Sequence, residues 1–251
     1  GKEKPNKFEV FQAAKQASLG IGILSALIQA GTLQGYQQKR SRTVLEAQAW
    51  NTLTDREKRN FLTLGEKYDY NLVDCIKKSV ELGTIADDGK KIMPPKRYET
   101  FKRKIEKYQQ IYAQNSKYEL FANWYFENQL LGYCSNLKLK DILGEDLCDS
   151  SDLPYIEGFS KRKFVGTVTE SKKAKSKAGN DYISLEMVDE SGKLRIMMCD
   201  SPKQNKCTDF INSGKQIPEK GDIVTILGSK AKDGMTIFAE DMSVMSQAIY
   251  M

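Results

Sequence analysis

Histidine is absent from the 251 residues of this chain, and cysteine is sparse. Without histidine there is no histidine general base, no Ser-His-Asp triad and no zinc site with a histidine ligand. The five cysteines include no CxxC pair and are odd in number, so we expect neither a disulfide framework nor a zinc ribbon. The chain also lacks a Walker-type glycine loop and a carboxylate pair spaced for two metal ions. We therefore expect no catalytic residue, no metal and no cofactor site in this chain.

Long apolar runs are missing as well. No run approaches the roughly 20 residues that a bilayer span needs, and the N-terminal residues contain no hydrophobic signal segment. We expect no membrane partner and a cytoplasmic location. The chain begins at Gly1 rather than at a methionine, as a piece of a longer polypeptide would.

Charged residues, by contrast, are plentiful. Lys and Arg number 39 against 33 Asp and Glu, which gives a formal net charge of +6. A modest positive excess permits a nucleic-acid partner without requiring one, so the positions of the charges matter more than their sum.

Helical periodicity dominates residues 1–143. In residues 1–36, Gly20-Ile21-Gly22 interrupts an apolar helical pattern. Glycine costs about 1 kcal/mol against alanine inside a helix, so two glycines one residue apart indicate a turn that needs positive φ or a close backbone approach. The segment predicts a helix-hairpin-helix. A helical connector over 37–143 follows, in which Thr54 and Asn71 are predicted N-caps.

The predicted hairpin is a candidate phosphate site. Unpaired backbone N–H groups at the start of a helix, together with the helix dipole, bind anions, and a DNA phosphate fits such a site. The alternative is a plain turn in a helical core. The candidate duplex-phosphate residues are Gly20, Ile21, Gly22, Lys15, Lys39, Arg40 and Arg42.

The second half of the chain changes character. Residues 144–157 are acidic, rich in Asp and Ser and broken by Pro154, which is typical of a linker. Residues 158–251 then alternate polar and apolar side chains over three short stretches, followed by a helical stretch and two more alternating stretches. This order predicts a five-stranded OB-fold barrel. The expected fold class is thus multidomain α+β, with an all-α N-terminal part.

The predicted barrel has a basic candidate surface. The loops after its first and fourth strands, which flank the binding face of an OB-fold, both contain lysines, and the second and third strands supply an aromatic ring and an arginine. The alternative is a solvated basic hairpin. The candidate single-strand residues are Lys172, Lys173, Lys175, Lys177, Tyr182, Arg195, Lys230 and Lys232.

Three stretches resemble the C-terminal region of the alpha subunit of bacterial DNA polymerase III, a C-family replicative polymerase. The stretch LGIGILSALIQAGTL, with Leu27-Ile28-Gln29-Ala30-Gly31, is similar to that family's hairpin and following helix. WYFENQLLGYCSN (Trp124 to Asn136) is similar to the segment before its barrel, and FVGTVTESKKAKSKAGNDYISLEMVDESGKLRIMMC is similar to the barrel itself.

The resemblance implies a DNA-binding role. In that family the hairpin holds duplex DNA and the barrel contacts the single-stranded template, whereas the catalytic aspartates and their Mg²⁺ lie in an upstream domain that this sequence does not contain. The resemblance further implies replisome partners at the nucleoid, and KYELF (Lys117 to Phe121) is similar to a sliding-clamp motif. The alternative is a free-standing OB-fold protein that binds single-stranded nucleic acid, or a replisome adaptor.

Overall fold

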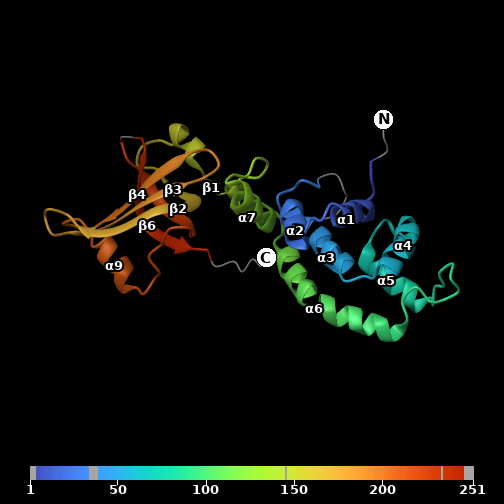
Figure 1. Cartoon of the computed structure of the whole chain (residues 1–251). Coiled ribbons are helices and arrows are strands. Elements are labelled where there is room, and N and C mark those ends of the chain that lie inside the picture. The colour runs from blue at the N-terminus through green and yellow to red at the C-terminus, as the bar shows by residue number, and fades with distance from the viewer. Residues whose placement is uncertain (1–3, 34–38, 145, 233, 246–251) are drawn as a thin grey trace. The chain divides into compact units, whose positions relative to one another are not determined.

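The computed structural model in Figure 1 describes residues 4–33, 39–144, 146–232 and 234–245. The chain divides into two compact units, with the boundary between Gly132 and Tyr133. The first unit is helical and the second is built on a β-barrel, which confirms the α+β class.

The first unit is a set of helices joined by short turns. Its elements are α1 (Lys7–Gln16), α2 (Ile21–Gln29), α3 (Arg40–Asn51), α4 (Asp55–Leu64), the 3-10 helix η1 (Glu66–Tyr68), α5 (Leu72–Glu81), α6 (Pro95–Lys117) and α7 (Glu119–Leu131).

Aromatic packing between α1 and α3 lies at the centre of this unit. Phe8 stacks on Trp50 with ring centroids 5.2 Å apart, and Phe11 lies 6.3 Å from the same indole. All three side chains are buried, and burial of a large side chain contributes about 1.5–3 kcal/mol. The packing therefore fixes α1 against α3.

Side-chain caps set the starts of α4 and α5 where the sequence predicts them. The Thr54 hydroxyl accepts a hydrogen bond from the Glu57 backbone N–H, and the Glu57 carboxylate accepts one from the Thr54 backbone N–H. Asn71 accepts from the Asp74 N–H at the start of α5. Caps of this kind contribute about 1 kcal/mol each because they satisfy backbone donors that the helix leaves unpaired.

The turn between α1 and α2 differs from the one expected at Gly20 and Gly22. Ser18, with φ 58°, takes the left-handed position, and the Leu19 N–H donates to the Ala14 carbonyl as in a Schellman motif. Gly20 is instead the extended N-cap of α2, and Gly22 is helical. A Cβ at either glycine would meet no atom within 4 Å. Positive φ and intramolecular crowding therefore do not explain these glycines.

The helix-hairpin-helix assignment is accordingly not confirmed. Two helices and a turn occupy the predicted place, but the turn uses Ser18 rather than the glycine pair. Residues 1–3 and 34–36 of the predicted segment lie outside the described residues.

The second unit confirms the five-stranded barrel. Its elements are α8 (Leu139–Leu143), β1 (Leu147–Cys148), the 3-10 helix η2 (Ser150–Tyr155), β2 (Lys161–Lys175), β3 (Asp181–Val188), β4 (Lys193–Cys199), α9 (Lys206–Asn212), β5 (Ile223–Lys230) and β6 (Thr236–Val244).

The strand order closes this sheet. The neighbours run β2-β3-β4-β6-β5, and β5 pairs back with β2. The pairs are antiparallel except β4 with β6, and α9 connects β4 to β5, which is the connectivity of an OB-fold. Gly166 lies where β2 passes from one neighbour to the other, and a Cβ there would approach the Val188 carbonyl oxygen to 2.7 Å. The closure thus requires glycine at this position.

The segment expected to be an acidic linker over 144–157 is instead part of the second unit. β1 pairs in parallel with β2, and η2 buries Leu153 against the barrel core. Asp149 is 1% exposed. The composition predicts a linker because the segment is acidic, rich in Asp and Ser and broken by Pro154. Its buried carboxylate has partners instead, since Asp149 pairs with Lys138 and Lys140 and accepts a hydrogen bond from the Ser191 hydroxyl in the β3–β4 turn.

None of the helices in the described ranges combines the length and the apolar character that a membrane span requires.

Candidate nucleic-acid interface

Along β3 and β4, successive side chains point alternately to the core face and to the outer face of the barrel. Ile183, Leu185 and Met187 of β3 are fully buried. Because side chains alternate along a strand, the residues between them lie on the outside of the barrel. Tyr182 and Arg195 therefore both belong to the outer face, as the sequence predicts.

A groove of about 300 Å³ lies on this outer face across β2, β3 and β4. The predicted residues Lys172, Tyr182 and Arg195 all line it, which brings together a cation from each of two strands and an aromatic ring. The cross-strand register explains the arrangement, since Lys172 lies opposite Ser184, which in turn lies opposite Met197. The remaining lining residues are Glu170, Ser184, Glu186 and Met197.

Phe238 extends the outer face onto β6 and was missed in the sequence. It lies opposite Met197 of β4, and its ring is 49% exposed although its neighbours Ile237 and Ala239 are buried. Strict alternation predicts an outward residue here, but a phenylalanine in an apolar stretch is ordinarily assigned to the core. The barrel thus presents a second aromatic ring beside the groove.

The basic loop expected between the first two barrel strands is largely strand. β2 and β3 continue as a hairpin that projects beyond the barrel in Figure 1, so Lys172, Lys173 and Lys175 are in β2 and only Lys177 lies in the turn. Lys173 lies opposite Ile183 and Lys175 opposite Asp181, so these two lysines are on the face away from the groove. All four lysines are exposed. The hairpin is therefore basic on both faces.

The two lysines predicted in the other flanking loop have different surroundings. The Lys230 ammonium donates to the carbonyl oxygens of Leu153 and Ile156 at 2.6 and 3.0 Å. It thereby fastens η2 to the barrel. Lys232 lies over the exposed Phe159 ring, 6.0 Å from the centroid. Of this pair, Lys232 is exposed and Lys230 is half-buried, and a role of Lys232 in binding a strand stays a prediction.

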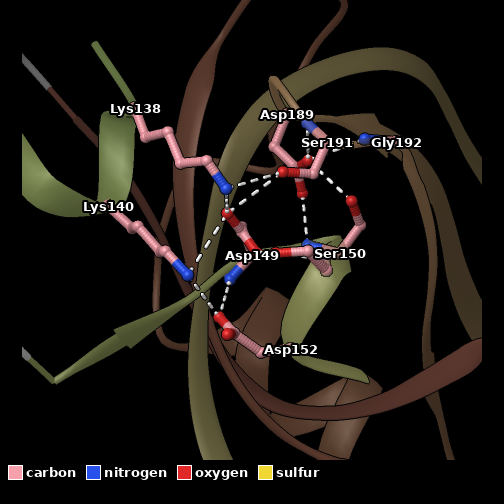
Figure 2. A network of polar contacts seen from close by, with 9 residues as sticks. Lys138, Lys140, Asp149, Ser150, Asp152, Asp189, Ser191 and Gly192 are labelled. Carbon is pink, nitrogen blue, oxygen red and sulfur yellow. Dashed lines mark hydrogen bonds and ion pairs between the residues drawn. The ribbon is translucent and has the colours of Figure 1, made fainter. Parts of the chain in front are cut away.

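A polar network anchors the β3–β4 hairpin on which the groove is built (Figure 2). Asp189 in the turn accepts hydrogen bonds from the Ser150 N–H and hydroxyl at 2.6 and 2.7 Å, and from the backbone N–H groups of Ser191 and Gly192. The turn is thus tied to η2 by a carboxylate that bonds several donors.

Two lysines complete this network from the opposite side, as Figure 2 shows. Asp149 lies 3.0 Å from the Lys138 ammonium and 3.3 Å from that of Lys140. Burial raises the pKa of Asp149, but hydrogen bonds from Ser151, Lys138 and Lys140 outweigh it and hold this pKa well below its usual range. Asp149 is therefore a buried carboxylate that stays ionised.

The cations predicted to hold duplex phosphates have internal partners in the first unit. Arg40 pairs with the buried Glu127 at 2.9 Å and donates to the Gln29 carbonyl. Lys15 pairs with Asp55 at 2.7 Å, and Lys39 donates to the Ser116 carbonyl at 3.3 Å.

The fourth of these cations, Arg42, is held in the same way. It donates to Asn71, lies 3.4 Å from the buried Glu46 and stacks over the Tyr112 ring. These contacts account for the cations without a phosphate, so duplex binding by this unit stays a prediction.

The segment similar to a sliding-clamp motif forms the junction of two helices. Lys117 ends α6, Tyr118 caps α7, and Phe121 is buried. No finding supports the clamp or other replisome subunits as partners.

Comparisons with known proteins give structural matches only, since no protein-family model and no curated protein matches the chain. The yeast Stn1 and Ten1 structure has a TM-score of 0.28 at 11% identity, covering 34% of this chain and 43% of that one. The mitochondrial single-stranded DNA binding protein Rim1 of S. cerevisiae has a TM-score of 0.27 at 17% identity, covering 37% and 100%. A replication protein A domain from Methanococcus maripaludis has a TM-score of 0.31 at 18% identity, covering 40% and 97%.

These findings correct the resemblance to the polymerase III alpha subunit, which is wrong. No family model for such a polymerase matches, and the similar structures above are a single-stranded DNA binding protein, a replication protein A domain and the Stn1 and Ten1 proteins. The strand order of the barrel is what assigns the second unit to the OB-fold.

Proposed function

We propose that the second unit binds single-stranded nucleic acid along the outer face of β3 and β4. The observation that carries this proposal is the groove itself, in which Lys172, Tyr182 and Arg195 converge on the face that OB-folds use for oligonucleotides. Core residues fill the other side of the same strands, so the groove is a surface feature on a rigid support.

Aromatic rings favour a single strand over a duplex. Bases in a single strand can stack on exposed rings, whereas those in a duplex are stacked on one another. Tyr182 lines the groove and Phe238 lies beside it. Two rings on one face can thus take successive or nearby bases without reading a sequence.

The charges give the bound strand an orientation. Lys172 lines the groove at the end where β2 and β3 extend into the basic hairpin. Two carboxylates, Glu170 and Glu186, also line the groove. Carboxylates repel phosphate but accept hydrogen bonds from the amino groups of bases. The proposal therefore places bases against the sheet and the sugar-phosphate backbone toward the hairpin.

Salt dependence tests the role of the hairpin lysines. If about four phosphates are neutralised, log K for a single strand should fall with log salt at a slope of about −3. Changing Lys172, Lys173, Lys175 and Lys177 together to alanine should flatten this slope, because fewer counterions are then released. Fluorescence anisotropy with a labelled oligonucleotide at several salt concentrations measures it.

A matched control removes the same charge from the first unit. Lys90, Lys96, Lys104 and Lys107 are exposed, and their joint change to alanine should leave the slope near that of the unmodified chain. An unchanged slope in the hairpin variant, or equal flattening in both variants, would show that the hairpin does not contact the phosphates.

A further inference from the structure

Lys58 of α4 is a buried lysine without a counter-ion at ion-pair distance. Its exposed fraction is 2%, and in the described part of the chain no carboxylate lies within 4.0 Å of its ammonium. Its electrostatic neighbours are Lys15, Asp55 and Glu57. Burial, followed by a side-chain hydrogen bond with Lys15 and then the charge of Lys15, lowers the pKa of Lys58 to about 8. A cation in this position is costly to keep unless an anion joins it.

Trp50 provides a second unsatisfied donor beside Lys58. Its indole is 2% exposed, and its Nε1–H has no hydrogen-bond partner within the residues that the structure describes. A buried donor without an acceptor is unfavourable, so such groups usually have a partner.

Both residues line the same small cavity. It has a volume of about 40 Å³, and Lys15 and Asn51, which also line it, are exposed and mark its opening to solvent. The volume exceeds the roughly 10–15 Å³ that a single water needs. The other lining residues are Phe11, Ala14, Leu19, Ile21, Leu24 and Ala47. The polar residues among those that line the cavity are therefore two lysines, a tryptophan and an asparagine.

The charge around the cavity also favours an anion. Lys15 and Lys58 contribute two positive charges. Of the two nearby carboxylates, Asp55 pairs with Lys15 at 2.7 Å and is 78% exposed, and Glu57 pairs with Arg97 at 2.9 Å. An anion that enters the cavity can approach Lys15 while the Asp55 side chain turns to solvent. A carboxylate or cation could not satisfy the indole and both ammonium groups as well as a compact oxyanion with several acceptor oxygens.

We propose that this cavity binds a phosphate group, with Lys58, Lys15 and Trp50 as its donors. The group is either inorganic phosphate or the terminal phosphate of a larger molecule, since the cavity opens at Lys15 and Asn51. The site lies wholly in the first unit and does not depend on the function proposed for the barrel.

Isothermal titration of the full chain with inorganic phosphate at constant ionic strength tests the site. We expect one site in the unmodified chain, and a Kd raised about tenfold or more in Lys58→Met, because one charged hydrogen bond contributes about 1.5–3 kcal/mol. Lys58→Met replaces the ammonium by an apolar group of similar length. Lys15→Gln, at a half-exposed position that tolerates change, should weaken binding as well. Lys104→Met, an exposed lysine of α6, should not.

Competition then identifies the source of the phosphate. A dinucleotide with a 5′ phosphate that displaces inorganic phosphate, where its unphosphorylated form does not, would assign the site to a terminal phosphate. Failure of both to compete would assign it to the free anion. The proposal is overturned if the unmodified chain binds no phosphate, or if Lys58→Met and Lys15→Gln bind it as tightly as the unmodified chain does.

Discussion

Replacing Tyr182 or Phe238 by alanine is expected to weaken the binding of a single-stranded oligonucleotide by about 1–3 kcal/mol for each ring, or about 5- to 150-fold in Kd. The physical reason is the loss of a base stacked on the ring. Tyr182 lines the groove and Phe238 lies opposite Met197 at its edge, so the double variant should lose both contributions. Anisotropy titration of each variant of the 251-residue chain with a labelled oligonucleotide gives the Kd values.

Tyr155 provides the matched control for this experiment. It is in η2 of the same unit, away from the groove-lining residues, and is 86% exposed. Tyr155→Ala should bind like the unmodified chain. If Tyr182→Ala and Phe238→Ala leave the Kd unchanged, or if all three variants lose affinity equally, the outer face of β3 and β4 is not the surface on which bases stack.

Replacing Asp149 by alanine is expected to destabilise the barrel unit by about 2–4 kcal/mol. Removing one partner of a fully buried ion pair costs about 3–5 kcal/mol, and this value is lower because Lys138 and Lys140 can still reach water. The Ser151 donors also lose their acceptor. Asp209→Ala, at an exposed position of α9, is the control and should change stability by no more than about 0.5 kcal/mol.

The probe for Asp149→Ala must report on the second unit. Both tryptophans, Trp50 and Trp124, are in the first unit, so indole fluorescence would miss the effect. Hydrogen exchange of the β3 and β4 amides is the appropriate measurement. Protection equal to that of the unmodified chain would show that the network in Figure 2 does not hold the hairpin.

The low pKa of Asp149 also predicts a pH dependence. Because the folded state holds this pKa below that of an unfolded aspartate, about 3.9, the ionised form stabilises the fold above that pH. This contribution is lost as the pH falls below about 4. In Asp149→Ala the stability difference between neutral and acidic pH should therefore be smaller than in the unmodified chain.

The barrel could be predicted because its signals are local. Ile183, Leu185 and Met187 recur at every second residue, and turns separate the strands. The N-caps Thr54 and Asn71 contact residues only three positions later in the chain, so the sequence predicts both of them. By contrast, α3 buries side chains on several of its sides. Its sequence therefore has no single apolar stripe from which the bounds of this helix could be predicted.

The candidate sites depend on contacts between distant residues, which the sequence does not show. The sequence places Lys230 in a loop beside the binding face, but its ammonium donates hydrogen bonds to carbonyl groups that lie more than seventy residues earlier in the chain. Lys58 lies in a strongly charged stretch that suggests solvent exposure, yet packing of α1, α3 and α4 buries it. Phe238 was overlooked because an outward phenylalanine and a core one have the same local pattern.

The central claim is that the barrel face binds single-stranded nucleic acid. The most direct test is the affinity of the full chain for one labelled oligonucleotide as a single strand and as a duplex, at two salt concentrations, with DNA and RNA versions compared. The account predicts tighter binding of the single strand in at least one of the two chemistries, weakening as salt rises. Equal or tighter binding of the duplex in both, or no binding of either strand form, would contradict it.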